Sequence, residues 1–345
     1  MDEIRNICII GAGNVGIACA VDFSLNYECN ISVLSSKANT LSSSFKIVDT
    51  DTNEKRIGKK IAITYDYKKA LEDADLVVIT VPSFCVEAVI EKVSNYNPKI
   101  ILFTPGYGGK ERYCQKLMQK GCAITGFDRS PYICRLSEPT VVSASKKTKI
   151  RVGCLNTNHS QELCDLYESL FGFEVELLPN YLTVALTPSN PVLHTSRLYA
   201  MFKDSSLSTP FSRIIKFYAE WNDESSEVML KIDAELQNLC RKIEIVEHVD
   251  LSKVLPLSVH YESPTVKAMT EKISHIKSFQ NINSPLIKKG EQYYIDSDSR
   301  YFKEDFDFGL AILQQYGKKY EIPTPMMDIV MDWYTKNFCS RIDKC

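Results

Sequence analysis

The chain has 345 residues, of which 44% are hydrophobic and 24% are charged, and its formal net charge is -2 at pH 7. This length suits two globular domains, and the near-neutral charge excludes a protein that binds nucleic acid through a strongly basic surface. No apolar run is as long as a membrane-spanning helix, and no signal peptide is recognisable. The twelve cysteines form no C-x-x-C pair. We therefore predict a cytoplasmic protein with reduced thiols, without a metal site or a membrane partner.

Short apolar runs alternate with helix-capable segments over the first half of the chain. The runs expected to form strands are residues 6–10, 31–35, 75–81, 99–105, 140–144 and 149–154. Strands that alternate with helices indicate βαβ units and a mostly parallel, doubly wound sheet. Two alternating runs on either side of a polar turn predict a β-hairpin inserted at residues 45–64.

The segment between the first predicted strand and the first predicted helix reads GAGNVG. Its G-x-G-x-x-G spacing provides a tight turn, close backbone approach to a pyrophosphate and close packing of helix on strand, and the helix N-terminus then attracts the phosphates. The alternative is a glycine turn that is merely structural. We favour dinucleotide binding, because the motif lies between a strand and a helix at the start of a βαβ series. The predicted pyrophosphate-binding residues are Gly11, Gly13, Asn14, Val15 and Gly16.

The second predicted strand ends in VLSSKAN, where an NAD-binding domain would carry an acidic residue for the ribose 2′-hydroxyl. Ser35, Ser36 and Lys37 stand there instead, and hydroxyls with an ammonium suit a 2′-phosphate, so we predict NADP(H). The alternative is a solvated loop in a domain that binds NAD through other contacts. Val81 and Pro82 end a further strand and are predicted to line the same cofactor crevice.

From about residue 185 the apolar spacing becomes mostly helical. Residues 225–243 are typical of this part, because six of their apolar residues can make one broad side of a helix: Val228, Leu230, Ile232, Leu236, Leu239 and Ile243. We therefore predict a Rossmann-type α/β domain over residues 1–184 and a mainly α-helical domain over residues 185–345.

The segment TPSNPVLHTSRLY, residues 187–199, predicts the first helix of the second domain. Asn190 suits an N-cap and Pro191 suits the first helical position, which places His194 at the end of the first turn. The positive end of the helix dipole disfavours imidazolium and attracts an anionic substrate group, so the position suits a general acid/base. The alternative is a histidine that packs between domains.

The segment DSDSRYFKEDFDFGL, residues 296–310, carries a second group of charged residues. The segment contains the acids Glu304, Asp305 and Asp307, and an acid here could hold a ring N–H of His194 and fix its tautomer. Arg300 could bind a substrate carboxylate. The alternative is a solvated acidic face, which we favour for Asp307. The other histidines lack a comparable context and are predicted to lie at the surface or to pack: His159, His248, His260 and His275.

These segments, taken in order, resemble the octopine/nopaline (opine) dehydrogenase family. The matching stretches are GAGNVG, NPVLH at 190–194, EWNDESSEVMLKIDAE at 220–235, RYFKEDFDFGL at 300–310 and PTP at 323–325. The resemblance covers about residues 5–335. It implies a nicotinamide-binding Rossmann domain, and a helical substrate domain like the C-terminal domain of 6-phosphogluconate dehydrogenase.

The family resemblance also implies roles for individual residues. His194 and Asp305 match the catalytic dyad of the family, and Arg300 matches an arginine that contacts substrate. The family often has proline after the histidine, where this chain has Thr195. The implied reaction joins the amine of an amino acid to a 2-oxo acid such as pyruvate and reduces the imine with NAD(P)H.

Two other classes of function remain open at this point. One is another two-domain dehydrogenase, of the glycerol-3-phosphate, 6-phosphogluconate or ketopantoate type. The other is a non-catalytic NADP(H) sensor. The sequence is compatible with a homodimer as well as with a monomer, and it does not identify the amine or the oxo acid.

Overall fold

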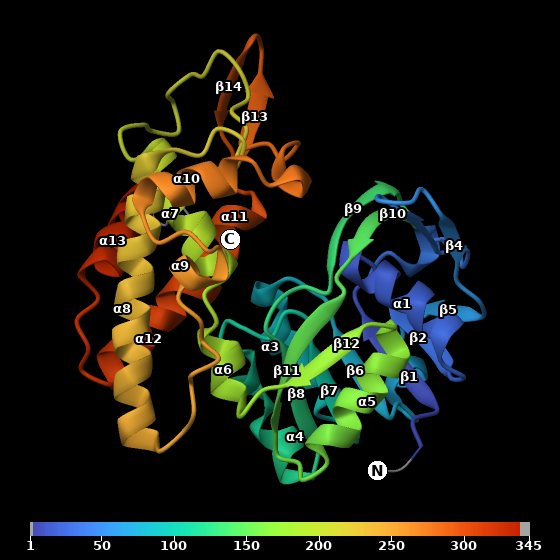
Figure 1. Ribbon diagram of the computed structural model, residues 1–345. Coiled ribbons are helices and arrows are strands. Elements are labelled where there is room, and N and C mark those ends of the chain that lie inside the picture. Colours follow the sequence, from blue (N-terminus) through green and yellow to red (C-terminus); the bar gives the residue numbers. More distant parts are fainter. Residues whose placement is uncertain (1–2, 339–345) are drawn as a thin grey trace. The chain divides into compact units, whose positions relative to one another are not determined.

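The computed structural model (Figure 1) describes residues 3–338. The chain divides into an N-terminal unit, Met1–Ala185, and a C-terminal unit, Leu186–Cys345. Helix α6 (Tyr181–Leu186) crosses the division between them. Each unit is described by itself below.

A large sheet forms the centre of the N-terminal unit. Its strands are, in spatial order, β12 (Glu174–Leu177), β11 (Lys149–Leu155), β8 (Ala123–Phe127), β7 (Ile100–Phe103), β6 (Leu76–Ile79), β1 (Asn6–Ile10), β2 (Asn30–Leu34) and β5 (Ile61–Thr64). The strands from β8 to β5 run parallel, whereas β11 lies antiparallel to β8 and parallel to β12. The prediction of a mostly parallel sheet is therefore confirmed.

The central strands are apolar on both faces because helices cover both sides of the sheet. Along β1, Ile7 and Ile9 point into one core, whereas Cys8 and Ile10 point into the other. Ile9 is level with Val33 of β2 and Val78 of β6, so the alternation continues across the sheet. The first core is covered by α1 (Asn14–Asn26) and α5 (Ser160–Phe171), and the second by α2 (Tyr67–Leu71), α3 (Ser83–Val93) and α4 (Gln115–Gln119). This is the predicted doubly wound arrangement.

A second, smaller sheet packs beside α1. Its order is β4 (Lys55–Ile57), β3 (Lys46–Asp49), β10 (Val141–Lys146) and β9 (Tyr132–Glu138). The antiparallel β3–β4 pair confirms the predicted hairpin. The prediction that residues 140–144 continue the parallel series is wrong, because β10 pairs with β9 and β3 in this small sheet. Apolar runs alone do not distinguish the two sheets, since both need buried strands.

Asp22 fixes the small sheet to α1. Its carboxylate is fully buried, forms ion pairs with Arg56 and Lys146, and accepts a hydrogen bond from the hydroxyl of Tyr132 at 2.9 Å. Burial raises the pKa of Tyr132 well above its usual value, so its hydroxyl stays protonated as the donor. The inserted hairpin is thereby held against the helix that follows the glycine loop.

The C-terminal unit is mainly helical, with one β-hairpin of β13 (Leu286–Lys289) and β14 (Gln292–Ile295). Its helices are α7 (Asn190–Phe202), α8 (Asp223–Glu247), α9 (Leu257–His260), α10 (Val266–Ser274), α11 (Arg300–Lys303), the π-helical turn η4 (Phe306–Leu310), α12 (Ala311–Lys319) and α13 (Pro325–Phe338). Asn222 is the N-cap of helix α8, and its side chain accepts a hydrogen bond from the Ser225 N–H. The predicted apolar side of residues 225–243 is confirmed except at Leu230, which is only half-buried. The buried members are Val228, Ile232, Leu236, Leu239 and Ile243.

Candidate active site

The glycine loop connects β1 to α1 in the N-terminal unit. Gly11 adopts a φ of 115°, a conformation that side chains other than glycine rarely adopt. Gly13 occupies the N-cap position, so Asn14, Val15 and Gly16 form the first turn of α1. A Cβ atom on Gly16 would lie only 1.9 Å from the Gly11 carbonyl oxygen, so this approach of helix to strand requires a glycine.

The remaining predicted cofactor residues gather at the same edge of the sheet. Ser35, Ser36 and Lys37 follow β2, and Val81 and Pro82 follow β6. Because β6, β1 and β2 are parallel neighbours, their carboxyl ends meet there. The structure thus brings together all of the predicted cofactor-binding residues in one region.

The loop is compatible with a bound dinucleotide. A Cβ atom on Gly13 would meet no atom of residues 3–338 within 4 Å, so no neighbour in this part of the chain explains the glycine. The space instead allows a phosphate to approach the backbone at the start of α1. Ser36 and Lys37 are exposed beyond β2, where a ribose 2′-substituent would lie.

Thr80 is a residue of this region that the sequence analysis missed. Its hydroxyl donates to the carbonyl oxygens of Ile10 at 3.0 Å and Gly11 at 3.1 Å, which fixes the glycine loop to the end of β6. The sequence could have indicated this role, since Thr80 is a polar residue that interrupts the apolar run between residues 76–79 and Val81.

In the C-terminal unit, helix α7 begins one residue earlier than predicted. The prediction that Asn190 is the N-cap is wrong: Ser189 holds this position, its side chain makes no capping bond, and Asn190 is the first helical residue. The Ser189 carbonyl already accepts the N–H of Leu193 at 3.0 Å, which extends the helix backwards. His194 still lies early in the helix, one turn after Pro191.

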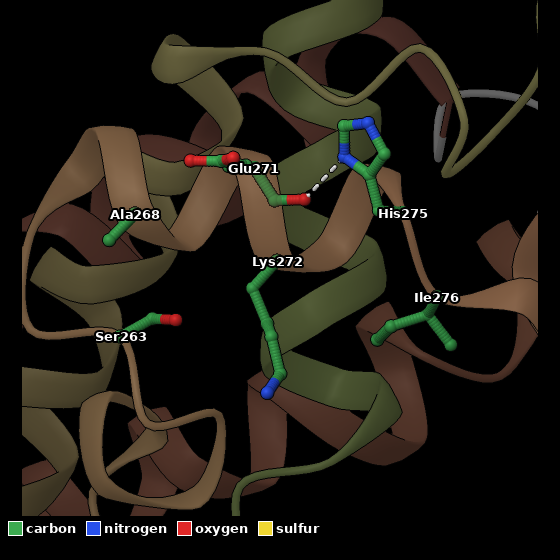
Figure 2. Close-up of a pocket in the computed structure, with 6 residues that line it drawn as sticks. All are labelled: Ser263, Ala268, Glu271, Lys272, His275 and Ile276. Carbon is green, nitrogen blue, oxygen red and sulfur yellow. Dashed lines mark hydrogen bonds between the residues drawn. The ribbon is translucent and has the colours of Figure 1, made fainter.

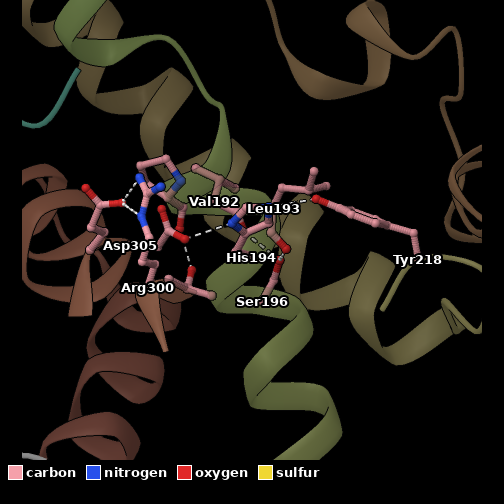
Figure 3. Close-up of polar contacts among 10 residues, drawn as sticks. Val192, Leu193, His194, Ser196, Tyr218, Arg300 and Asp305 are labelled. Atoms are coloured by element: carbon pink, nitrogen blue, oxygen red, sulfur yellow. Dashed lines mark hydrogen bonds and ion pairs between the residues drawn. The ribbon is translucent and has the colours of Figure 1, made fainter. Parts of the chain in front are cut away.

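His194 is hydrogen-bonded through both ring nitrogens, as Figure 3 shows. Its Nδ1 lies 2.7 Å from Oδ2 of Asp305, and its Nε2 lies 2.6 Å from the hydroxyl of Tyr218. The rings of Phe217 and Tyr301 pack edge-on against the imidazole. The three hydrogen-bonded residues are only 4% to 8% exposed, so these bonds form in a region of low dielectric constant.

Asp305 immediately precedes the π-helical turn η4. The N–H of Leu310 donates to its carbonyl at 2.9 Å, five residues back, and such turns often occur at functional sites. Gly309 lies in η4, and a Cβ atom there would come within 2.8 Å of the Pro191 ring. The close approach of η4 to the first turn of α7 therefore depends on this glycine. Burial raises the pKa of the Asp305 carboxyl, and the charge of His194 opposes that shift.

Tyr218 and Arg197 are the two residues of this site that the sequence analysis missed. Arg197 lies on α7 and is 2% exposed; its guanidinium donates to the carbonyl oxygens of Phe217 at 2.9 Å and Glu220 at 2.7 Å. Burial lowers the pKa of Arg197 to about 10, and the nearby Glu220 opposes the shift, so the group remains a cation at neutral pH. Tyr218 lies in a loop, where no regular spacing in the sequence could have indicated it. Arg197 lies three residues after His194, and this spacing places the two side chains on the same face of a helix.

Arg300 and Asp307 occupy different surroundings. Arg300 lies on α11, and its Nε and Nη2 donate to Oε2 of Glu304 at 2.9 and 2.6 Å, with 68% of the side chain exposed. The assignment of Asp307 to a solvated acidic face is wrong. Asp307 is half-buried and accepts a hydrogen bond from the Tyr334 hydroxyl at 3.0 Å, because η4 turns it toward α13.

The other histidines lie at the surface: His159, His248, His260 and His275. His275 lines a hollow beside α10, together with Ser263, Ala268, Glu271, Lys272 and Ile276 (Figure 2). None of the predicted site residues lines it. Within residues 3–338, no cluster of His, Cys, Asp and Glu has the composition of a metal site. No helix in this part of the chain combines the length and apolar character needed to cross a membrane.

Comparisons with known proteins agree with this organisation. Residues 177–337 match the alpha-helical domain of NAD/NADP octopine/nopaline dehydrogenase, and residues 6–149 match the N-terminus of NAD-dependent glycerol-3-phosphate dehydrogenase. An opine dehydrogenase of Haliotis discus hannai is 26% identical, over 81% of this chain and 73% of the relative. An opine dehydrogenase of Arthrobacter sp. (strain 1C) is 23% identical, over 96% and 90%.

A solved structure of octopine dehydrogenase in complex with NADH and agmatine shares the fold. It has a TM-score of 0.84 and 18% identity, and the match covers 97% of this chain and 90% of that one. A Rossmann-type unit followed by this helical unit defines a two-domain nicotinamide-dinucleotide-dependent dehydrogenase. The chain belongs to the octopine/nopaline (opine) dehydrogenase family.

Proposed function

We propose that the chain is an NAD(P)H-dependent opine dehydrogenase, which joins the amine of an amino acid to a 2-oxo acid such as pyruvate and reduces the resulting imine. The observation that carries this proposal is the buried hydrogen bond between His194 and Asp305, in the helical unit that matches the octopine/nopaline dehydrogenase domain. Among relatives of known structure, octopine dehydrogenase has been solved with pyruvate and with L-arginine. These ligands support amino acid and 2-oxo acid substrates for this chain.

The reaction requires one proton in addition to the hydride. An ammonium group, a 2-oxo acid, NAD(P)H and one proton yield a secondary ammonium, NAD(P)⁺ and water. The nicotinamide supplies the hydride when the cofactor is bound, and the protein must supply the proton that lets the carbonyl oxygen leave as water. We assign this proton to the His194–Asp305 pair, in which Asp305 orients the imidazole and stabilises its charged form.

Arg300 is the proposed carboxylate-binding residue. Its guanidinium is mostly exposed, and its fork geometry suits a carboxylate. Two nitrogens of Arg300 already donate to the carboxylate of Glu304. A substrate carboxylate must therefore either share the guanidinium with Glu304 or displace Glu304 from it.

We propose NADP(H) as the preferred cofactor, with NAD(H) as the alternative. The support is the pair of exposed residues Ser36 and Lys37 after β2, and residues 30–48 contain no carboxylate that would repel a 2′-phosphate. An acidic residue would be expected at this position in a domain that selects NAD.

We also propose a cytoplasmic enzyme whose partners are small molecules. The ten cysteines among residues 3–338 are all free thiols, which suits a reducing compartment. A homodimer stays a prediction that sedimentation of the purified protein can test.

A matrix of 2-oxo acids against amines, followed by the absorbance of NADPH and of NADH, tests the function directly. We expect oxidation of the cofactor only when both an oxo acid and an amine are present, and a secondary amine product in the mass spectrum. Oxidation with an oxo acid alone would instead identify a hydroxy-acid dehydrogenase. Cofactor binding without turnover for any pair would favour a non-catalytic sensor.

A further inference from the structure

The imidazole of His194 has no ring nitrogen left for a substrate. Nδ1 is bonded to the carboxylate of Asp305 and Nε2 to the hydroxyl of Tyr218, at 2.7 and 2.6 Å. A proton can leave His194 toward a substrate only if Tyr218 moves away or if the proton passes through its hydroxyl. The surroundings of Tyr218 decide between these two routes.

Tyr218 is held in place by aromatic packing. Its ring stacks on Phe279, with centroids 4.3 Å apart and an angle of 22°, and lies nearly parallel to Trp221 at 6.1 Å. The ring is 4% exposed, and its edge packs against Phe217 at 4.8 Å. The hydroxyl can move away from His194 only if the ring moves with it, which would disrupt these contacts. Each contact stabilises the position of the ring by burying part of its apolar surface.

The backbone on both sides of Tyr218 is fixed as well. Arg197 donates to the carbonyl oxygens of residues 217 and 220, and also to the side chains of Asn222 and Ser225 at 3.3 and 3.1 Å. Arg197 and His194 lie on the same helix, one turn apart. The helix that carries the imidazole therefore also holds the loop that carries the hydroxyl, so their separation is rigidly set.

We propose that Tyr218 is a further catalytic residue, whose hydroxyl passes the proton from His194 to the substrate oxygen that leaves as water. This inference rests on the proposed function. Asp305, His194 and Tyr218 then form one relay, and the hydroxyl rather than the imidazole contacts the reacting group. Arg197 is a positioning residue, because it acts on the reaction only through the loop of Tyr218.

The two protonation states of His194 explain how the relay works. In the neutral ring, Nδ1–H donates to Asp305 and Nε2 accepts the Tyr218 O–H. In the imidazolium, Nε2–H donates to the Tyr218 oxygen, and the tyrosine O–H is directed at the substrate instead.

The relay transfers one proton without forming a free phenolate. The O–H bond of Tyr218 breaks as its proton reaches the hydroxyl oxygen of the amine–carbonyl adduct, and the C–O bond breaks with release of water. The Nε2–H proton of His194 moves to the Tyr218 oxygen in the same step and leaves a neutral imidazole. The reduced nicotinamide, when bound, would supply the hydride for the carbon of the C=N bond. Solvent restores the proton on His194.

The variant Tyr218→Phe removes only the hydroxyl and retains the ring. We expect its single-turnover rate of NADPH oxidation to fall about 10²-fold or more, the usual share of general acid catalysis. The dissociation constant of NADPH, measured by its fluorescence, should not change. Tyr320→Phe is the matched control, because Tyr320 is another largely buried tyrosine of the C-terminal unit whose hydroxyl donates to Glu247. Its single-turnover rate should equal that of the wild type.

A second variant keeps the hydroxyl and changes its acidity. Fluorinated tyrosine incorporated at position 218 lowers the phenol pKa with little change in shape, so the alkaline limb of the pH–rate profile should move to lower pH. An unchanged limb, or a Tyr218→Phe rate within about threefold of the wild type, would overturn the relay and indicate that the hydroxyl only covers Nε2. A wild-type enzyme that oxidises NADPH with no pair of amine and oxo acid would overturn the proposed function itself.

Discussion

His194 Nδ1 lies 2.7 Å from Asp305 Oδ2, although 111 positions separate the two residues in the sequence. The imidazole comes from α7, one turn after Pro191, and the residue before a π-helical turn supplies the carboxylate. Because both side chains are buried, the carboxylate interacts with the imidazole strongly enough to fix its tautomer and orientation.

Replacement of either partner should abolish most of the activity. We expect His194→Ala and Asp305→Asn each to lower turnover by roughly 10²–10⁴-fold, because both remove the acid/base function of one unit. The double variant should be little worse than either single variant, since residues that act together are not additive. Asp307→Asn is the control, because Asp307 bonds Tyr334 instead of His194. Near-normal turnover of His194→Ala, with cofactor binding intact, would reject the catalytic assignment.

Gly309→Ala tests the contact that sets the position of the dyad. The added Cβ would lie within 2.8 Å of the Pro191 Cβ and Cγ atoms, so α7 and η4 must separate. We expect a loss of about 1–3 kcal/mol in the free energy of unfolding, as is usual for an overpacked core, and a lower turnover. The double variant Gly309→Ala/Pro191→Gly removes both contacting atoms and should recover part of the loss. A double-mutant cycle, with unfolding in denaturant as the measurement, gives the coupling energy between the two positions. If the two single variants lower the free energy of unfolding additively, the contact between Gly309 and Pro191 is not the cause of the loss.

The parts of the fold that could be predicted from sequence are those that depend on local spacing. The apolar runs around β1, β2, β6 and β7 and the glycine loop between β1 and α1 have local physical causes, and the structure confirms these elements. The misplaced β10 shows the limit, because pairing with β9 or with a strand of the large sheet depends on distant residues. The pairing of His194 with Asp305 came from the family resemblance. Tyr218 could not be found, since only the folded loop brings it to His194.

Lys37→Ala tests the choice of cofactor. If Lys37 pairs with a 2′-phosphate, its loss should raise the KM for NADPH about tenfold, the equivalent of about 1.4 kcal/mol, and leave the KM for NADH unchanged. Lys336→Ala removes the same charge from an exposed position of α13 and serves as the control. A wild-type enzyme with the lower KM for NADH, or equal changes for both cofactors in Lys37→Ala, would exclude this role.

The stability of the C-terminal unit should depend on pH through Asp233 of α8. Its carboxylate accepts the Leu257 N–H at 2.7 Å, but burial raises the pKa of Asp233 to about 6. Between pH 4 and pH 6 the folded state therefore keeps a proton that the unfolded state has lost, and the free energy of unfolding decreases as the pH rises. The total effect is about 3 kcal/mol, from a shift of about two pKa units.

Asp233→Asn removes this titration. The stability of the variant relative to the wild type should therefore increase by about 3 kcal/mol from pH 4 to pH 7. The two tryptophans, Trp221 and Trp333, both belong to the C-terminal unit, so their fluorescence in denaturant reports its unfolding. Asp250→Asn is the control, because hydrogen bonds from Ser252 lower the pKa of the exposed Asp250 carboxyl below the ordinary Asp value of about 3.9. Its contribution to stability is therefore already present above pH 4, and the stability of this variant relative to the wild type should stay nearly constant from pH 4 to pH 7. Equal slopes for the two variants would contradict the assignment of the effect to Asp233.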